Sequence, residues 1–393
     1  MSLPVAAVQR ALQEEGLDGW LLYDFRGTNP IASRIAGLTG SGKMATRRWY
    51  YLVPAQGEPR GLVHAIERHN LDALPGSKHP YAGRQQLDTG LRDLLRGARR
   101  VAMEYSPCNN IPYVSRVDAG TIEAVRGFGV EVVSSGDLVQ RFEAVWTDDV
   151  YRTHVRASES LYRIKDRALQ LIGERLKSGR PLTEYDVQQA MVGWFEEEGL
   201  VTSDPPHVAA QENAGDPHYS ATRDAHRMIR PGEIVLLDLW GKLPSPGAVF
   251  ADITWMAFTG PVVPDEYGRA FAAARRGRDA AVELVQRAVR EGREVRGFEV
   301  DRACRGVLET EGYAAQFIHR TGHSLGEEVH GNGVNMDDYE THDDRRLIPG
   351  TGFTIEPGIY TSRFGVRTEI NMFVGEHDAR VTGPQQQEIV ALG

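Results

Sequence analysis

The chain has 393 residues, 41% of them hydrophobic and 25% charged, so its composition is that of an ordinary globular protein and its length favours two domains. A formal net charge of −9 without any block of Lys or Arg argues against binding to nucleic acid. No basic leader or long apolar run indicates secretion or a membrane helix, and two cysteines are too few for a disulfide framework, so a reducing cytoplasm is the expected compartment.

The first 150 residues alternate between predicted helices and strands. A helix is predicted over Val5 to Glu15 and another around Leu87 to Leu95, and buried strands over residues 19–25, 47–54 and 100–105. This alternation predicts an α/β domain over residues 1–150. Nothing in it has the spacing of a catalytic motif.

Two helices and two strands are predicted next. An amphipathic pattern starts near Ser158, and a second helix follows Pro181, where Thr183 and Asp186 have the spacing of a capping box. Strand-like segments then cover residues 233–240 and 249–258.

The same order is repeated towards the C-terminus. Long apolar stripes predict helices over residues 265–291 and 300–311, and strand-like segments follow at 353–360 and 367–374. Two copies of helix, helix, strand, strand form a weak internal repeat. The prediction is an α+β domain over residues 151–393.

Each copy of the repeat places two acidic residues inside apolar strands: Asp238 and Asp252 in the first, Glu356 and Glu369 in the second. A buried carboxylate is costly unless it is paired or binds a cation. Any one of these acids alone is better explained as a strand end in water or the partner of an arginine. All four together favour convergence on two divalent cations, if the strand pairs share one sheet.

The stretch HRTGHSLGEEVHG, residues 319–331, contains three histidines, His319, His323 and His330. Their spacing would place them on one face of a helix, but the glycines between and after them disfavour a helix. Because His323 lies between the two acid pairs in sequence, it can supply one imidazole. Oxygen-rich ligation with one imidazole suits manganese, cobalt, iron or zinc.

With these residues the chain resembles the superfamily of creatinase, aminopeptidase P, prolidase and methionine aminopeptidase. Five residues follow that family's ligand order Asp, Asp, His, Glu, Glu, and the segments EPGIY, RTE, DITW and PHYS resemble its motifs. The resemblance implies a pita-bread catalytic domain over residues 151–393 after a smaller N-terminal α/β domain over residues 1–150. It also implies a homodimer.

The resemblance assigns the metal ligands residue by residue. Asp252 and Glu369 are expected to be shared by two divalent ions, manganese first, with cobalt, zinc or iron as alternatives. Asp238 completes one site, and His323 with Glu356 completes the other. Two ions held in this way make a water molecule nucleophilic near neutral pH.

The resemblance also implies catalytic and substrate-binding residues. Glu356 is expected to move a proton from the nucleophile towards the leaving nitrogen, and His218 and His330 to contact the scissile carbonyl. His319 matches another histidine of the cleft, and Arg367 and Tyr360 match positions on the product side of the substrate.

Two alternatives stay open for Arg367, which can bind a free C-terminal carboxylate or form an ion pair with a metal ligand.

The chain departs from the family pattern at several positions, and these departures affect the positioning of the substrate more than the binding of the metals. Thirteen residues separate Asp238 from Asp252, more than is usual, and Gly331 and Ile370 follow His330 and Glu369 where acids are common. His207 and His226, which flank the PHYS segment, are expected to lie in loops outside the site.

The function implied is hydrolysis of the Xaa-Pro bond in short peptides, with dipeptides preferred because Arg367 offers a carboxylate anchor and the chain is compact. Aminopeptidase P activity on longer peptides is the main alternative. A creatinase-like C–N hydrolase and a non-catalytic peptide-binding relative are the others. The expected partners are a short peptide and a second copy of the chain, with no nucleic acid and no membrane.

Overall fold

The computed structural model describes residues 3–393. The chain divides into two compact units, unit 1 (Met1–Phe142) and unit 2 (Glu143–Gly393). Within the described residues, no helix is both long enough and apolar enough to cross a membrane.

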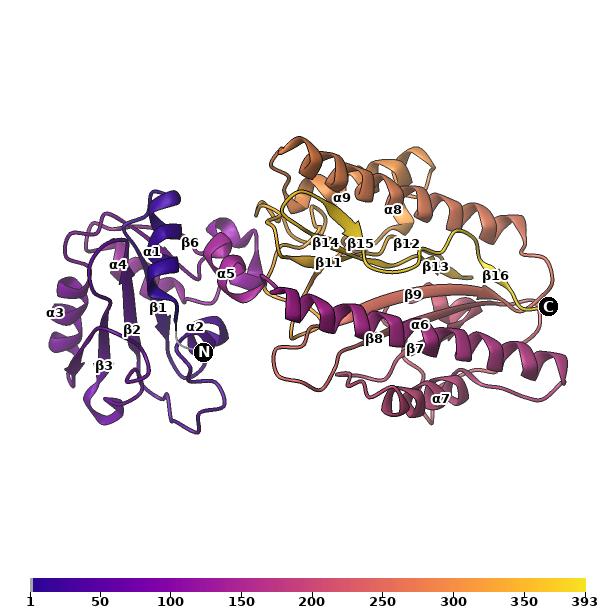
Figure 1. Ribbon diagram of the computed structural model, residues 1–393, viewed down its shortest axis with the longest axis horizontal. Helices are drawn as coiled ribbons and strands as arrows, with labels where there is room; N and C mark the ends of the chain where they lie inside the picture. Colours follow the sequence, from indigo (N-terminus) through magenta and orange to yellow (C-terminus); the bar gives the residue numbers. More distant parts are fainter. Residues whose placement is uncertain (1–2) are drawn as a thin grey trace. The chain divides into compact units, whose positions relative to one another are not determined.

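Unit 1 contains a mixed sheet of strand order β4-β3-β2-β1-β5-β6, with helices packed against it (Figure 1). Its elements are α1 (Val5–Glu14), β1 (Gly19–Asp24), α2 (Pro30–Ile35), β2 (Trp49–Pro54), β3 (Arg60–His64), β4 (Ser77–Tyr81), α3 (Arg84–Leu94), β5 (Arg100–Met103), α4 (Ala119–Arg126), β6 (Glu131–Ser134) and α5 (Gly136–Glu143). The strands predicted from sequence appear as β1, β2 and β5. Strand β4 was not predicted, since SKHPY is polar and contains a proline, which an edge strand tolerates.

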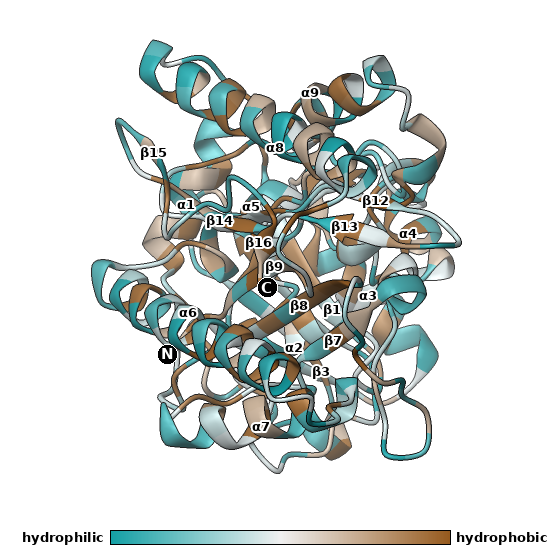
Figure 2. Ribbon diagram, turned by 90° about the vertical axis from the view of Figure 1, so that its right-hand side faces the viewer, coloured by the Kyte–Doolittle hydropathy of each residue, from teal (hydrophilic) through white to brown (hydrophobic). Residues whose placement is uncertain are grey.

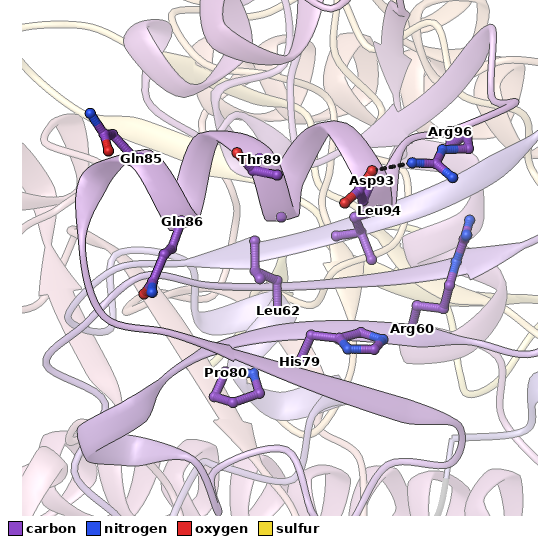
Figure 3. A pocket seen from close by; sticks show the side chains of 12 residues that line it. Arg60, Leu62, His79, Pro80, Gln85, Gln86, Thr89, Asp93, Leu94 and Arg96 are labelled. Carbon is purple, nitrogen blue, oxygen red and sulfur yellow. Dashed lines mark hydrogen bonds and ion pairs between the residues drawn. The ribbon is translucent and has the colours of Figure 1, made fainter.

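A cavity of about 670 Å³ lies in unit 1 between α3 and the strands β3 and β4 (Figure 3). Arg60 and His79 line it from the strands, and the ion pair between Asp93 and Arg96 lines it from the α3 side. Its lining includes none of the acids or histidines expected to bind metal.

The helices of unit 2 form two pairs. They are α6 (Asp148–Lys177), α7 (Glu184–Glu197), α8 (Asp265–Glu291) and α9 (Gly297–Thr310). The predicted capping box of α7 is confirmed, since Thr183 Oγ1 accepts from the Asp186 peptide N–H and Asp186 Oδ2 accepts from the Thr183 peptide N–H. Helix α6 begins ten residues before the predicted Ser158, because Thr147 caps it and its first turns are largely polar.

The strands of unit 2 lie between these helix pairs, with α8 and α9 along one side and α6 and α7 along the other (Figure 1). They are β7 (His207–Ala210), β8 (Ile234–Gly241), β9 (Ala251–Phe258), β10 (Ser324–Leu325), β11 (Gly352–Ile355), β12 (Gly358–Tyr360), β13 (Gly365–Arg367), β14 (Ile370–Val374), β15 (Ala379–Val381) and β16 (Val390–Ala391). The ladders are β16-β9-β8-β7, β10-β11-β14-β15 and β12-β13. Figure 2 shows the apolar strands β8 and β9 inside and polar residues on the outer faces of α6 and α8.

The two strands predicted in the second copy of the repeat are both interrupted. The first is broken between β11 and β12 at Glu356 and Pro357, because proline has no N–H for a ladder and the Glu356 N–H instead donates to Thr321 O at 2.7 Å. The second is broken between β13 and β14 at Thr368 and Glu369. Both glutamates therefore lie outside the regular ladders.

A buried histidine makes the stability of unit 2 depend on pH. His154 of α6 is fully buried, with Nδ1 2.8 Å from Phe250 O and Nε2 2.7 Å from Thr382 Oγ1. Burial lowers the pKa of His154 from its ordinary value of 6.5 to about 4. Because the unfolded chain then binds the proton more tightly, stability is lost as pH falls from 6.5 towards 4. Between pH 7 and pH 5 the loss should be about 2 kcal/mol.

Thermal and urea unfolding at a series of pH values check this prediction. His154→Asn should flatten the pH dependence between pH 7 and pH 5, whereas replacing the exposed His377 in the same way should leave the slope of the wild type. Equal slopes for all three proteins would show that His154 is not the titrating group.

Candidate metal centre

The first pair of acids lies on one face of the antiparallel β8–β9 ladder. Asp238 is directly opposite Thr254, and Asp252 lies two residues before Thr254 on the same strand, so all three side chains point the same way. Both aspartates are buried, at 7% and 5% exposure, among apolar strand residues. The Thr254 hydroxyl lies 3.1 Å from Asp238 Oδ1 and 2.7 Å from Glu369 Oε2, which joins the two copies of the repeat.

The second pair of acids is positioned by hydroxyl groups and by the strand breaks. The Thr354 hydroxyl of β11 donates to Glu356 Oε1 at 3.0 Å and accepts from the His323 peptide N–H at 2.9 Å. One threonine therefore places a candidate base and a candidate imidazole ligand. Gly322 permits this approach, since a Cβ there would lie 2.0 Å from Thr354 O.

His323 points at the acids through Nε2. This atom lies 3.6 Å from Asp252 Oδ2 and 3.4 Å from Glu356 Oε1, while Nδ1 lies 3.2 Å from Ser324 O. Residues 319–331 are not helical. Burial lowers the pKa of His323 more than Glu356 raises it, so the ring is neutral and Nε2 offers a lone pair.

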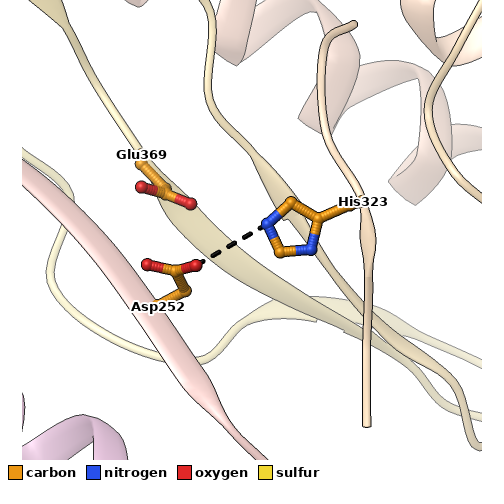
Figure 4. Close-up of side chains that lie close together, drawn as sticks. All are labelled: Asp252, His323 and Glu369. Carbon is orange, nitrogen blue, oxygen red and sulfur yellow. Dashed lines mark ion pairs between the residues drawn. The ribbon is translucent and has the colours of Figure 1, made fainter. Parts of the chain in front are cut away.

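Three of these side chains form a compact cluster that fits a metal ion. Asp252, His323 and Glu369 each present a ligand atom, and the atoms lie within 4.8 Å of one another (Figure 4). Burial, and then repulsion from neighbouring carboxylates, raises the pKa of Asp252 and of Glu369 well above the ordinary values. Within residues 3–393, Asp252 Oδ1 has no hydrogen-bond partner. A divalent cation would satisfy this atom and remove the repulsion.

The pKa of Glu356 shifts in the direction opposite to those of Asp252 and Glu369. Burial alone would raise its pKa, but the combined attraction of His323, His319, Arg367 and Arg320 lowers it. A carboxylate that is charged and faces His323 can accept a proton, which is the property that a general base needs.

Arg367 forms an ion pair with Asp238. Its Nε donates to Thr254 Oγ1 at 2.8 Å, and its Nη1 lies 3.4 Å from the Tyr360 hydroxyl. Of the two alternatives left open by the sequence, the structure displays the ion pair with a candidate ligand.

The other predicted histidines lie around this centre at different distances. His330 packs edge-on against His323 with ring centroids 4.3 Å apart, and His319 Nε2 lies 2.9 Å from the Tyr360 hydroxyl. The proximity of His323, and then burial, lowers the pKa of His330 to about 3, so this ring is neutral. His218 is exposed in the turn that follows η4 (Gln211–Gly215).

The turn that carries His218 is tied to the fold by a buried glutamate. Glu184, the first residue of α7, accepts hydrogen bonds from the Tyr219 hydroxyl at 2.6 Å, the Arg227 peptide N–H at 2.8 Å and the Ala210 peptide N–H at 2.7 Å. Nothing in the sequence distinguishes this acid, because a glutamate in the first turn of a helix is common.

The expectation that His207 lies in a loop outside the site is wrong. His207 begins β7, where its Cα is directly opposite Asp238, and its Nδ1 is 3.6 Å from Asp238 Oδ2. Its ring also packs edge-on against Trp240. A strand of four residues after two prolines has too short a pattern to be recognised. His226, by contrast, is exposed in a loop and stacks on Tyr185.

Comparisons with known proteins identify a family of metallopeptidases. Residues 158–376 match metallopeptidase family M24. The "Probable dipeptidase PepE" of Mycobacterium tuberculosis (strain ATCC 25618 / H37Rv) is 32% identical over 347 residues, which cover 87% of this chain and 84% of that protein. The Xaa-Pro dipeptidase of Lactobacillus helveticus is 33% identical over 163 residues, which cover 41% and 40%.

The fold is also that of a solved structure. The crystal structure of dipeptidase PepE from Mycobacterium ulcerans matches with a TM-score of 0.69 at 23% identity and covers 99% of this chain and 96% of that one. The expected fold class is confirmed: an α/β N-terminal domain and a pita-bread C-terminal domain.

Proposed function

The chain belongs to metallopeptidase family M24, and from that membership we propose that it hydrolyses the Xaa-Pro bond of short peptides, dipeptides in the first place. The observation that carries the proposal is the buried group of Asp252, His323 and Glu369, in which one carboxylate oxygen has no partner within the described chain. Relatives described as a dipeptidase and as an Xaa-Pro dipeptidase support the substrate class.

Five residues would hold two divalent ions, with manganese proposed first and cobalt, zinc or iron as alternatives. Asp252 and Glu369 would be shared, Asp238 would complete one site, and His323 and Glu356 would complete the other. Such ions, when bound, acidify water and polarise a carbonyl group. The donor set of carboxylates with one imidazole suits these metals.

Glu356 is the proposed proton carrier. The nitrogen of an Xaa-Pro bond is a tertiary amide, so it must gain a proton before proline can leave. Glu356 is ionised in the resting state and lies at a strand break facing His323, where it can take a proton from the attacking water and deliver it to that nitrogen.

Two histidines are proposed to bind the substrate carbonyl. His330 lies against His323 and can donate a hydrogen bond from its neutral ring, and His218 is proposed to approach from the turn that Glu184 holds. His319 and Tyr360 form a hydrogen-bonded pair and are proposed to line the product side.

The position of Arg367 bears on the choice between dipeptides and longer peptides. Its ion pair with Asp238 supports an indirect role, in which Arg367 orients a ligand and Tyr360, more than a direct bond to a substrate carboxylate. Aminopeptidase P activity therefore remains the second candidate. The preference for dipeptides then rests on the named relatives.

One incubation distinguishes these activities. The Mn²⁺-loaded protein should release proline from Xaa-Pro dipeptides, as read by mass spectrometry of the products, and leave creatine intact. Cleavage of Xaa-Pro-Yaa tripeptides without cleavage of dipeptides would establish the aminopeptidase P activity instead. A homodimer is proposed from the family resemblance, and light scattering of the purified protein measures it.

A further inference from the structure

Strands β9 and β14 lie against each other, yet they belong to different ladders. Strand β9 carries Asp252, and Glu369 immediately precedes β14. No ladder of backbone hydrogen bonds joins these two strands in the part of the chain that the structure describes. The distance between the two acids must therefore be set by other contacts.

One such contact is the bond from the Thr254 hydroxyl to Glu369, and a carboxamide supplies two more, to the backbone of Asp252 itself. Asn371 Oδ1 accepts from the Asp252 peptide N–H at 3.0 Å, and Asn371 Nδ2 donates to Asp252 O at 2.8 Å. The orientation of the amide follows from these partners, since a peptide N–H only donates and a carbonyl only accepts. Asn371 is 1% exposed and lies two residues after Glu369.

The carboxylate of Asp252 is held less firmly than its backbone. Oδ1 has no partner within residues 3–393, and Oδ2 lies 3.6 Å from His323. The neighbouring acids Asp238 and Glu356 repel it. Because Oδ1 makes no hydrogen bond within the described residues, the position of this side chain depends on the peptide that Asn371 holds.

The chemistry of this contact requires an uncharged amide. An aspartate at position 371 could still accept from the Asp252 N–H, but it would lose the bond to Asp252 O and add a further negative charge beside the cluster. An apolar residue would leave both groups of a buried peptide without partners, which costs stability.

We propose that Asn371 is a positioning residue, which fixes the separation of Asp252 and Glu369 and thereby sets the affinity of the centre for its second divalent ion. The inference rests on the metal centre described under the proposed function. Asn371 itself would contact neither the substrate nor an ion.

Gln386, between β15 and β16, provides a matched control because it contacts the same strand, β9. Gln386 Oε1 accepts from the Met256 N–H at 2.8 Å, and Gln386 Nε2 donates to Met256 O at 2.7 Å, so its carboxamide pairs with β9 in the same way. Gln386 is 3% exposed, but Met256 belongs to the apolar core and binds no metal.

The test compares Asn371→Leu with Gln386→Met in the full chain. Each protein is stripped with a chelator and titrated with Mn²⁺ by calorimetry, and the coupling between two bound Mn²⁺ ions is read by electron paramagnetic resonance. Asn371→Leu should weaken the second ion about 10- to 100-fold and alter the coupling, whereas Gln386→Met should change affinity less than about threefold. Both should lower Tm, because each leaves one buried peptide unpaired, and Gln386→Met also removes the bond from Nε2 to Glu388 O.

Three results decide the inference. Wild-type affinity and coupling in Asn371→Leu would overturn it, and so would an equal loss in both variants, which would mean general damage to β9. If the wild-type chain itself takes up no pair of ions, the proposed metal centre fails, and the failure is seen before any variant is compared. Asn371→Ser, which is small enough to admit water, replaces the leucine variant if that protein does not fold.

Discussion

Replacing Asp252 with asparagine should make the metal-free protein more stable and at the same time abolish its stabilisation by Mn²⁺. Asp252 is a buried carboxylate, repelled by Asp238 and Glu356 and lacking a partner at Oδ1 within the described residues. Neutralising it removes that repulsion, so the free energy of unfolding without metal should rise by about 1–3 kcal/mol.

The stabilisation by Mn²⁺ that the variant loses should be of similar size. In the wild type, each ion at a concentration 100 times its Kd should add about 2.7 kcal/mol. The variant should show no Mn²⁺-dependent rise in Tm, because a ligand proposed to serve both ions has been removed. Differential scanning calorimetry with chelator and with Mn²⁺ gives both quantities from one preparation.

Asp343→Asn is the matched control for this experiment. Asp343 is also fully buried, but it is paired with Arg345, whose Nε lies 2.8 Å away, and it accepts from the Asn335 N–H. Its neutralisation removes the negative charge that faces the buried Arg345 and should lower stability. If Asp252→Asn destabilised the chelated protein as Asp343→Asn does, the acid at position 252 would have a structural role and would not serve to bind cations.

Glu356→Gln should lower kcat about 10²- to 10⁴-fold, because the amide can neither accept the proton of the attacking water nor protonate the leaving nitrogen. The amide retains the size of the side chain and its contact with the Thr354 hydroxyl. Steady-state rates on an Xaa-Pro dipeptide, normalised to bound metal, check the prediction. Turnover near the wild-type rate at equal metal content would remove Glu356 as the proton carrier.

The acids of the first strand pair could be predicted because their surroundings made them conspicuous. Asp238 and Asp252 interrupt apolar strands, and both strands formed as expected. Glu356 and Glu369 were identified by the same reasoning, although the strands that should have contained them are broken. Pro357 was the available signal for one break, because proline cannot donate to a ladder.

The neutral residues that organise the centre could not be predicted. Thr254, Thr354 and Asn371 are polar residues in strands, and the sequence alone does not distinguish those that face a buried acid from those that face water. Their importance comes from pairing across elements distant in the chain, such as Asn371 with Asp252. His207 was misplaced for the same reason, since only the register of β7 against β8 brings it to Asp238.

For Arg367 the sequence allowed two partners, and the structure favours one of them. Its place two residues before Glu369 allowed either a substrate carboxylate or a ligand as its partner. The fold brings β13 beside β8 and β9, so that Arg367 meets Asp238 and Thr254.

The most direct test of the account is anomalous diffraction from crystals of the Mn²⁺-loaded protein, measured at the manganese edge. Two peaks should appear among Asp238, Asp252, His323, Glu356 and Glu369, with Asp252 and Glu369 contacting both. A map without peaks at these side chains, in protein whose activity is retained, would contradict the proposal that the buried acids exist to hold a pair of cations.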